Sequence, residues 1–189
     1  AILVTSATEA LQYFSYGAME TFVPLYAVAV LGLSEWQIGI FFGAQVLTTA
    51  LTKPLMGRAS DRIGRRPMIA LGLATSALGT AAVTLAPSYA LMLLVGIVYG
   101  LGLSVVTSST SAYVSELARA RSYGSAMGVL STIMDVGHST GPMVTGLLVV
   151  AIGYRPSFLA VSVLLLAGTA IFWMVAVPDR SEAKVAKLV

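Results

Sequence analysis

Six long apolar runs, separated by short polar links, constrain this chain more than any other feature of its sequence. The runs cover roughly residues 2–31, 36–55, 68–86, 89–114, 125–152 and 157–177. A bilayer core about 30 Å thick needs about 20 apolar residues per helix, and helices satisfy their own backbone polar groups there. The sequence therefore predicts an all-α membrane protein with six transmembrane helices at 1–177 and a polar cytoplasmic tail at 178–189.

The composition supports this class. Of the 189 residues, 57% are hydrophobic and only 10% are charged, whereas a soluble domain has about 25% charged residues. There are no cysteines and only one histidine, which excludes disulfides, thiolate metal ligands and an H-E-x-x-H metal site. We expect no cofactor, no bound metal and no nucleic-acid partner, because the basic residues lie between apolar runs. The start at Ala1, already inside an apolar run, suggests a piece of a longer protein.

The basic residues predict the orientation. Every Lys and Arg except Arg155 falls in or beside the second-to-third connection, in the fourth-to-fifth connection or in the tail. Positive charge gathers on the cytoplasmic side of membrane proteins. Both termini are therefore expected in the cytoplasm, and the protein in a plasma (inner) membrane.

The first apolar run carries a stripe of polar residues. Glu9, Tyr13, Tyr16 and Glu20 fall within about 60° of one another on a helical wheel, and Gln12 borders them. Ionisable residues at membrane depth usually face a water-filled cavity or a partner helix. The stripe therefore predicts a transport cavity, with substrate contacts and proton coupling. Carboxylates wetted at the two helix ends, with packed tyrosines, are the structural alternative.

The fifth run carries a second candidate face. Asp135 and His138 are spaced i, i+3, and Ser131 and Pro142 extend the face. A carboxylate beside an imidazole could hold or relay a proton, or the two could simply neutralise each other. The hydroxyls of "TSSTS" at 107–111 could line a path, but bonding to the carbonyls of their own helix is the expected outcome.

The segment "GRASDRIGRRP" at 57–67 concentrates charge between the second and third runs. It resembles the loop signature of the major facilitator superfamily, G-x-x-x-D-R-x-G-R-[RK]. The matching residues are Gly57, Asp61, Arg62, Gly64, Arg65 and Arg66. The resemblance implies a cytoplasmic loop whose charges brace one conformation against the opposite six-helix half. Asp61 is placed to pair with nearby arginines or to cap a helix.

A second segment resembles the family's antiporter signature, G-x8-G-x3-G-P-x2-G-G. The matching residues are Gly128, Gly137, Gly141, Pro142 and Gly146, with Thr145 in place of one glycine. The resemblance implies export rather than import. The structural alternative is that the same residues form a row of small side chains that lets two helices cross closely, with no bearing on the direction of transport.

Other features favour the C-terminal six-helix half of such a transporter, with a 3+3 inverted repeat. First halves of proton-coupled members carry an arginine in R-x-x-x-G of the fourth span, where this chain has Gly96. The third and sixth runs carry the fewest polar residues. Each set of three helices is therefore expected to end in a lipid-facing helix, which suggests the repeat. The other half would come from the same protein or a second copy.

These features predict half of a secondary transporter working by alternating access, with proton-coupled export of a small organic molecule. The alternatives are a uniporter or importer of a metabolite, or a non-transporting membrane scaffold or sensor. An intramembrane enzyme is not expected, because no base is placed to activate a serine. The expected partners are the bilayer, protons and a small-molecule substrate.

Overall fold

The chain folds into a bundle of long helices. The computed structural model describes residues 2–86, 88–118 and 123–176. These residues form α1 (Ile2–Ala29), α2 (Glu35–Ile63), α3 (Arg65–Ala82), α4 (Tyr89–Leu117), α5 (Tyr123–Ile152) and α6 (Tyr154–Val175). Within those ranges no strand occurs. The expected tail at 178–189, Arg119 and Arg121 lie outside the described residues.

Local chemistry sets the helix ends. Ser34 and Gln37 form a capping box: the Gln37 backbone N–H donates to Ser34 Oγ, and the Ser34 N–H donates to Gln37 Oε1 at 2.9 Å. Gly64, at φ 117°, is the only residue between α2 and α3, and Gly153, at φ 83°, separates α5 from α6. Both junctions need a positive φ that glycine adopts without a steric penalty.

The segment 57–67 differs from the loop expected from the sequence. α2 continues through Ile63 and α3 begins at Arg65, so the charged residues lie on two helices that meet at Gly64. The apolar run marks only the part of a helix suited to lipid. Arg62 lies in the last turn of α2, where a positive charge is favourable, and the helix therefore extends beyond the apolar part.

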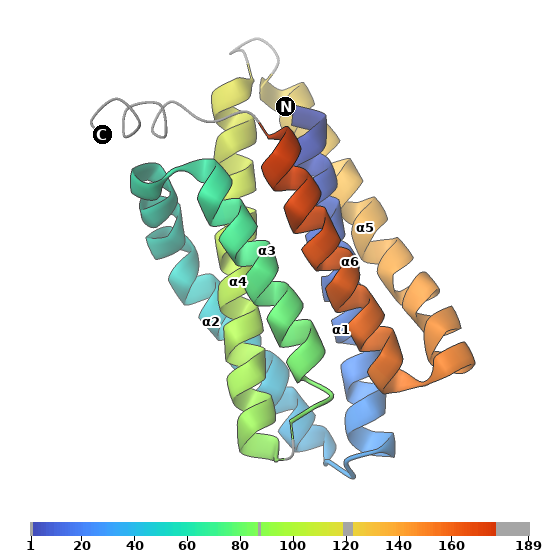
Figure 1. Cartoon of the computed structure of the whole chain (residues 1–189). Coiled ribbons are helices and arrows are strands. Elements are labelled where there is room, and N and C mark those ends of the chain that lie inside the picture. The colour runs from blue at the N-terminus through green and yellow to red at the C-terminus, as the bar shows by residue number, and fades with distance from the viewer. Residues whose placement is uncertain (1, 87, 119–122, 177–189) are drawn as a thin grey trace.

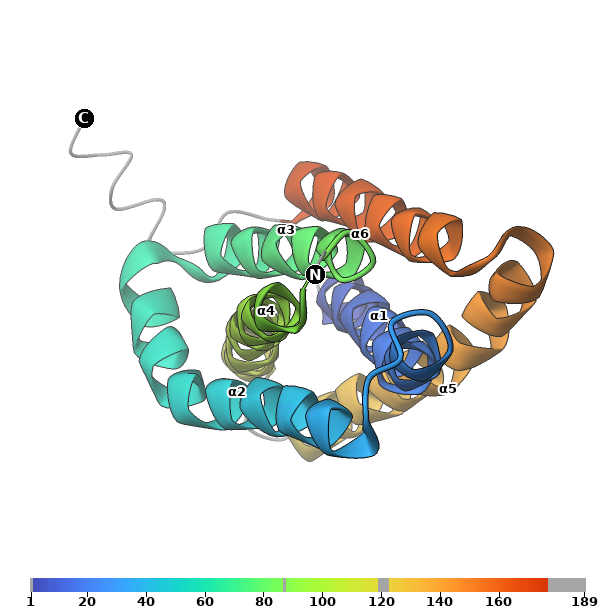
Figure 2. The same ribbon diagram turned by 90° about the horizontal axis from the view of Figure 1, so that it is seen from below.

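The helices form three layers. Figure 2 shows α3 and α6 side by side on one side, α1 and α4 in the middle, and α2 and α5 on the opposite side. α5 packs on α1 and α2 packs on α4, whereas α2 and α5 do not contact each other within the described residues. The expectation that α3 and α6 are peripheral agrees with this arrangement.

The two sets of three helices repeat the same plan. The first helix of each set lies in the middle, the second on one side and the third on the other. α1 and α4 run in opposite directions, as Figure 1 shows. This is the 3+3 inverted repeat expected from the plain third and sixth runs.

The helices differ in how apolar they are. By length and hydropathy alone, α2, α4 and α6 could cross a membrane. The other three helices lack a stretch that is long and apolar enough by this measure: α1 carries Glu9 and Glu20, α5 carries Asp135 and His138, and the 18 residues of α3 include two arginines. Glu9, Glu20, Asp135 and His138 thus lie on the two helices that pack most extensively on each other.

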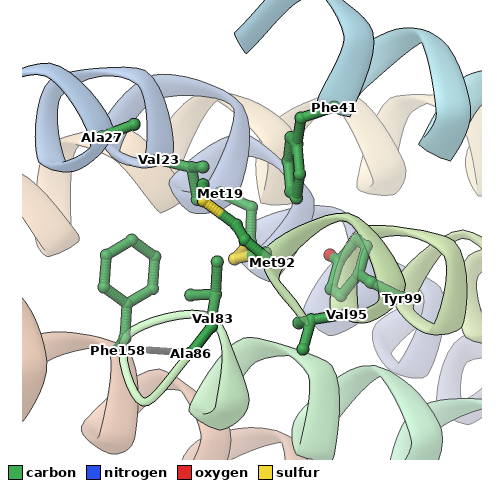
Figure 3. Close-up of a cluster of buried hydrophobic side chains, with 10 residues drawn as sticks. All are labelled: Met19, Val23, Ala27, Phe41, Val83, Ala86, Met92, Val95, Tyr99 and Phe158. Atoms are coloured by element: carbon green, nitrogen blue, oxygen red, sulfur yellow. The ribbon is translucent and has the colours of Figure 1, made fainter. Parts of the chain in front are cut away.

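A hydrophobic cluster fills the end of the bundle away from the N-terminus (Figure 3). Met19 and Val23 of α1, Phe41 of α2, and Met92 and Tyr99 of α4 are all buried there. A second cluster, built on Leu73, Val106 and Leu165, joins α3, α4 and α6. These clusters fix α1 and α4 as the core of the bundle.

α1 and α5 touch through their backbones. A Cβ atom added to Gly137 would overlap the Ala10 carbonyl, and one added to Gly141 would overlap the Phe14 carbonyl. From the other side, a Cβ on Gly17 would overlap the His138 carbonyl. Small residues allow helices to approach this closely in lipid, where van der Waals packing replaces the hydrophobic effect.

We predict that Gly141→Ala destabilises the fold, because the methyl group meets backbone atoms that cannot rotate away. Overpacking of this kind costs about 1–3 kcal/mol. Thermal unfolding of the purified protein in detergent measures the effect. Gly128→Ala, on the same helix with open space at its Cβ position, is the control and should unfold like the unmodified protein. Equal stability of the two variants would contradict the close α1–α5 contact.

Candidate functional site

The polar stripe of α1 is divided by the fold into a buried part and an open part. Glu9 and Gln12 are 2% and 0% exposed. Tyr13 and Tyr16 are half-buried, and Glu20 is exposed. The stripe is therefore continuous along the helix but not uniform in its surroundings.

Contacts around α1 define the direction of the open part. Leu11 packs against Gly168 of α6, Ser15 bonds to Thr80 of α3, and Gln12 bonds to α4. The glycine contacts described above occupy the side toward α5. On the helical wheel, Tyr13, Tyr16 and Glu20 therefore fall between the α4 side and the α5 side, away from the contacts with α3 and α6.

A chain of hydrogen bonds anchors α1 behind the open part. Gln12 Nε2 donates to the Tyr99 hydroxyl (3.5 Å), which donates to Ser15 Oγ (3.3 Å). Ser15 Oγ lies 3.0 Å from Thr80 Oγ1, and Thr80 donates to the Ser76 carbonyl (2.8 Å). The direction of the last bond makes Ser15 the donor to Thr80. Sequence reasoning missed this network, since single hydroxyls on three different helices give no periodic signal.

Glu9 lies in a different environment. Its side chain lies near Thr110 of α4 and interacts electrostatically with Lys53 of α2, while Oε2 has no hydrogen-bond partner. Four of the five hydroxyls of the segment 107–111, that of Thr110 included, donate to carbonyls one turn earlier, as with Ser108 to Ser104 (2.7 Å). This confirms the expectation for that segment.

His138 pairs across helices rather than along its own helix. Its Nε2 lies 2.9 Å from Glu20 Oε2, with side chains 42% and 49% exposed. The sequence had suggested Asp135 as the neighbour, but Asp135 is exposed, and the imidazole is paired with Glu20 instead. The α1–α5 backbone contact beside Gly17 brings Glu20 within reach, and this contact was not visible in the sequence.

Aromatic rings surround the imidazole. Tyr16 stacks on His138, with centroids 5.5 Å apart and an interplanar angle of 22°. Tyr13 approaches both rings edge-on, at 6.3 Å from His138 and 6.1 Å from Tyr16. Tyr13, Tyr16, His138 and Glu20 therefore form one cluster, which we call the tyrosine–histidine corner.

The charged residues near Gly64 form a brace at the opposite end of the bundle from the cluster of Figure 3. Arg65 is buried and pairs with Asp61 of α2 and with Glu116 of α4, the latter at 2.7 Å. Arg66 donates to the Trp173 carbonyl and places its guanidinium 4.5 Å from the centre of the Trp173 ring. Asp61 thus pairs with an arginine, as expected. Arg62 is exposed, and a Cβ on Gly57 would meet open space.

The glycines of α5 have separate environments. Gly137 and Gly141 contact α1, as described, and Gly146 faces the ring of Phe22 (3.2 Å from an added Cβ). Gly128 has open space at its Cβ position. Thr145, which replaces one glycine of the signature, is fully buried, and its hydroxyl has no hydrogen-bond partner among the described residues. The close contact expected from the small-residue spacing is present at the two central glycines.

Gly96 also has a packing role. A Cβ at this position would lie 2.6 Å from the ring of Phe41 on α2. A long arginine side chain would require Phe41 to move. This accounts physically for the absence of arginine at this place in the fourth span.

Both the sequence and the fold resemble those of known proteins. The sequence model of the Major Facilitator Superfamily matches residues 5–188. A Streptococcus pneumoniae protein described as multi-drug resistance efflux pump PmrA is 31% identical over 145 residues, 74% of this chain and 36% of the relative. A Lactococcus lactis homologue of that pump is 30% identical over 159 residues, 82% of this chain and 39% of the relative.

Among solved structures, a bacterial homologue of the human lysosomal transporter Spinster, inward-facing and occupied, has a TM-score of 0.80 at 20% identity. The match covers 97% of this chain and 46% of that one, and at this identity it establishes the fold alone. The chain spans well under half the length of the curated relatives it matches.

We predict that Tyr99→Phe lowers stability, because it removes the acceptor of Gln12 and the donor to Ser15 in a buried site. Leaving buried polar groups unsatisfied costs about 1–3 kcal/mol each. Chemical denaturation followed by tryptophan fluorescence measures the change. Tyr123→Phe, an exposed tyrosine on α5, should leave the unfolding free energy unchanged. A Tyr99→Phe protein as stable as this control would contradict the network.

Proposed function

The chain belongs to the Major Facilitator Superfamily, and from this premise we propose that it forms one six-helix half of a proton-coupled secondary transporter that exports a small organic molecule. Members of this family are membrane transporters rather than enzymes, and the chain is accordingly an integral membrane protein. The half would work by alternating access around a site near the middle of the membrane.

One observation carries this proposal: an open polar face on α1 and α5. Tyr13, Tyr16, Glu20, Asp135 and His138 all retain exposed surface on these two helices. Charged groups at membrane depth are expensive against lipid, by about 2.5–3.5 kcal/mol each on insertion scales. A face of this kind is therefore suited to a hydrated cavity, and Glu20, Asp135 and His138 supply groups that can exchange protons.

The same face argues for a second half. The helices α2 and α5 flank α1 and α4 on the side away from the peripheral α3 and α6. A second six-helix bundle on that side would enclose the polar face and complete the cavity. It would come from the rest of a longer polypeptide or from a second copy of this chain.

Export is the favoured direction for two reasons. The α5 glycines resemble the antiporter signature, and the relatives described as multi-drug resistance efflux pumps are exporters by name. The energy would come from the proton gradient, since moving one charge across the membrane yields about 2.3 kcal/mol per 100 mV.

A flux assay on the full-length protein in proteoliposomes tests the proposal. Uphill movement of a compound from a panel of organic molecules, driven by an imposed proton gradient and abolished by a protonophore, is the expected result. Flux of the compound that is unchanged by the protonophore would identify a uniporter. Absence of movement across the panel would favour a scaffold or sensor.

We predict that Glu20→Gln or Asp135→Asn reduces gradient-driven flux by at least about tenfold, because each removes a group that can carry a proton. The amount and stability of the protein should be unchanged. Glu35→Gln removes one carboxylate at the exposed start of α2, away from the polar face, and serves as the control. Full flux in both test variants would contradict proton coupling through these residues.

The proposed orientation places both termini in the cytoplasm of a cell with the protein in its plasma membrane. The sequence has no cysteine, so single cysteines can be labelled without background from this chain. We predict that Leu31→Cys, in the α1–α2 turn, reacts with an impermeant maleimide in intact cells, because that turn faces outward. Arg58→Cys should react only after permeabilisation. The reverse pattern would invert the topology.

A further inference from the structure

A crevice runs along the α1–α5 contact on the side of α1 that faces away from the tyrosine–histidine corner. Its volume is about 330 Å³, and it is lined by one face of α1 within residues 7–14 and one face of α5 within residues 133–140. On the helical wheel of α1, the centre of the lining residues lies about 140° from the centre of Tyr13, Tyr16 and Glu20. The crevice is therefore separate from the polar face and from the side on which a second six-helix half is proposed.

The side chains that line the crevice are apolar, with one exception. Ala7, Leu11 and Phe14 line it from α1, and Val136 lines it from α5. The exception is Thr140, whose hydroxyl donates to the Val136 carbonyl at 2.7 Å. An ordered water needs about 2–4 polar partners, and a polar ligand has similar needs. The lining supplies no side chain for either, so the crevice is suited to hydrocarbon.

The crevice is elongated along the helices. Gly137 meets Ala10 and Gly141 meets Phe14, so the two lining stretches run side by side in the same direction. Seven residue steps at 1.5 Å per residue give the crevice a length of about 10 Å. Its 330 Å³ is also roughly twice the volume of an apolar cavity of about 150 Å³ that binds benzene. A long apolar crevice of this size suits a linear hydrocarbon chain better than a compact ring.

The crevice is continuous with the lipid-facing surface of α5. Val136, which lines it, lies on the same helical face as Met143, Leu147 and Val150, and all four are exposed apolar residues. An exposed apolar face of a membrane-spanning helix lies against acyl chains. Figure 2 shows that α5 and α6 diverge from their junction, with α1 between them. Hydrocarbon can therefore enter the crevice without crossing a polar region.

The position of the crevice along α1 places it within one leaflet. The 28 residues of α1 give a helix of about 42 Å, longer than a hydrocarbon core of about 30 Å. Ala7 lies about 8 Å from the start of the helix at Ile2, and Phe14 about 18 Å from it. The crevice therefore lies at the depth of acyl chains rather than headgroups, in the leaflet where α1 begins. In the proposed orientation this is the cytoplasmic leaflet.

We propose that an acyl chain of a phospholipid in this leaflet binds in the crevice and packs against the lipid side of the α1–α5 contact. Ala10 and Gly137 belong both to the crevice lining and to the backbone contact between the two helices. A chain in the crevice adds van der Waals contacts to both helices at once, next to the place where their backbones touch. The phospholipid is then a specific ligand of this contact. The inference does not depend on the proposed substrate or on proton coupling.

Photolabelling of the full-length protein in nanodiscs tests the inference. The probe is a phosphatidylcholine with a diazirine group midway along one acyl chain, present as a minor component, and peptide mapping identifies the labelled residues. Leu11 and Phe14 in the crevice are only partly exposed, whereas Leu166 on α6 and Leu71 on α3 are exposed apolar residues outside it. A bound chain should label Leu11 and Phe14 severalfold more than Leu166 and Leu71. Lipid that only surrounds the protein should label residues in order of their exposure.

A variant that fills the crevice isolates the site. Ala7→Phe should reduce the labelling of Leu11 and Phe14 by at least about tenfold, because a close-packed crevice leaves no room for both the ring and the chain. Ala170→Phe adds the same ring on an exposed face of α6 and is the matched control, which should label like the unmodified protein. Val136→Phe fills the crevice from α5 and serves where Ala7→Phe does not fold. The labelling pattern of the unmodified protein needs no variant.

Three results would each overturn the inference. Labelling that follows exposure would mean that ordinary surrounding lipid meets this surface. Full labelling of Leu11 and Phe14 in a folded filled variant would place the chain outside the crevice. No label at Leu11 and Phe14, with Leu166 labelled, would mean that another part of the full-length protein or a partner protein covers the crevice. None of these results bears on the flux assay, so the proposed function is tested separately.

Discussion

The contact between the backbones of α1 and α5 is the constraint on which the rest of this half depends. Gly17 on one helix and Gly137 and Gly141 on the other leave no room for a Cβ. The helices can therefore approach closely enough for Glu20 to reach His138 and for Tyr16 to stack on it. A side chain at any of the three glycines would push the two helices apart and would separate the groups of the corner. The same close contact therefore sets both the helix spacing and the geometry of the corner.

The fold also divides the polar residues of α1 into a buried set and an open set. Gln12 and Ser15 turn toward α4 and α3 and are held by Tyr99 and Thr80, whereas Tyr13, Tyr16 and Glu20 stay open. Satisfied buried polar groups fix the rotation of a helix, because rotating it would leave them without partners. The buried network thus determines which way the open face points, although none of its members needs to touch a substrate.

Much of this arrangement could be predicted from the sequence, and the failures have physical causes. Apolar runs gave the number and order of helices, and helical periodicity placed Tyr13, Tyr16 and Glu20 on one face. Periodicity along a single helix does not show contacts between helices, so it suggested Asp135 rather than Glu20 as the neighbour of His138 and overlooked Gly17 and Tyr99. Hydropathy likewise marked only the apolar part of α2, because charged residues such as Arg58 continue a helix into the aqueous region.

The two charged centres of this half differ in the way a carrier of the proposed kind requires. The brace at Gly64 is built on arginine: Arg65 joins Asp61 and Glu116, and a guanidinium keeps its charge throughout the physiological pH range. Protons cannot remove the positive member of that brace, so its release requires a competing contact or a movement of helices. The corner is built on histidine, and a single proton changes whether Glu20 has a positive partner. In a carrier of the proposed kind, permanent charges at the brace would hold one conformation firmly, while a titratable group at the corner would let the open face respond to protons.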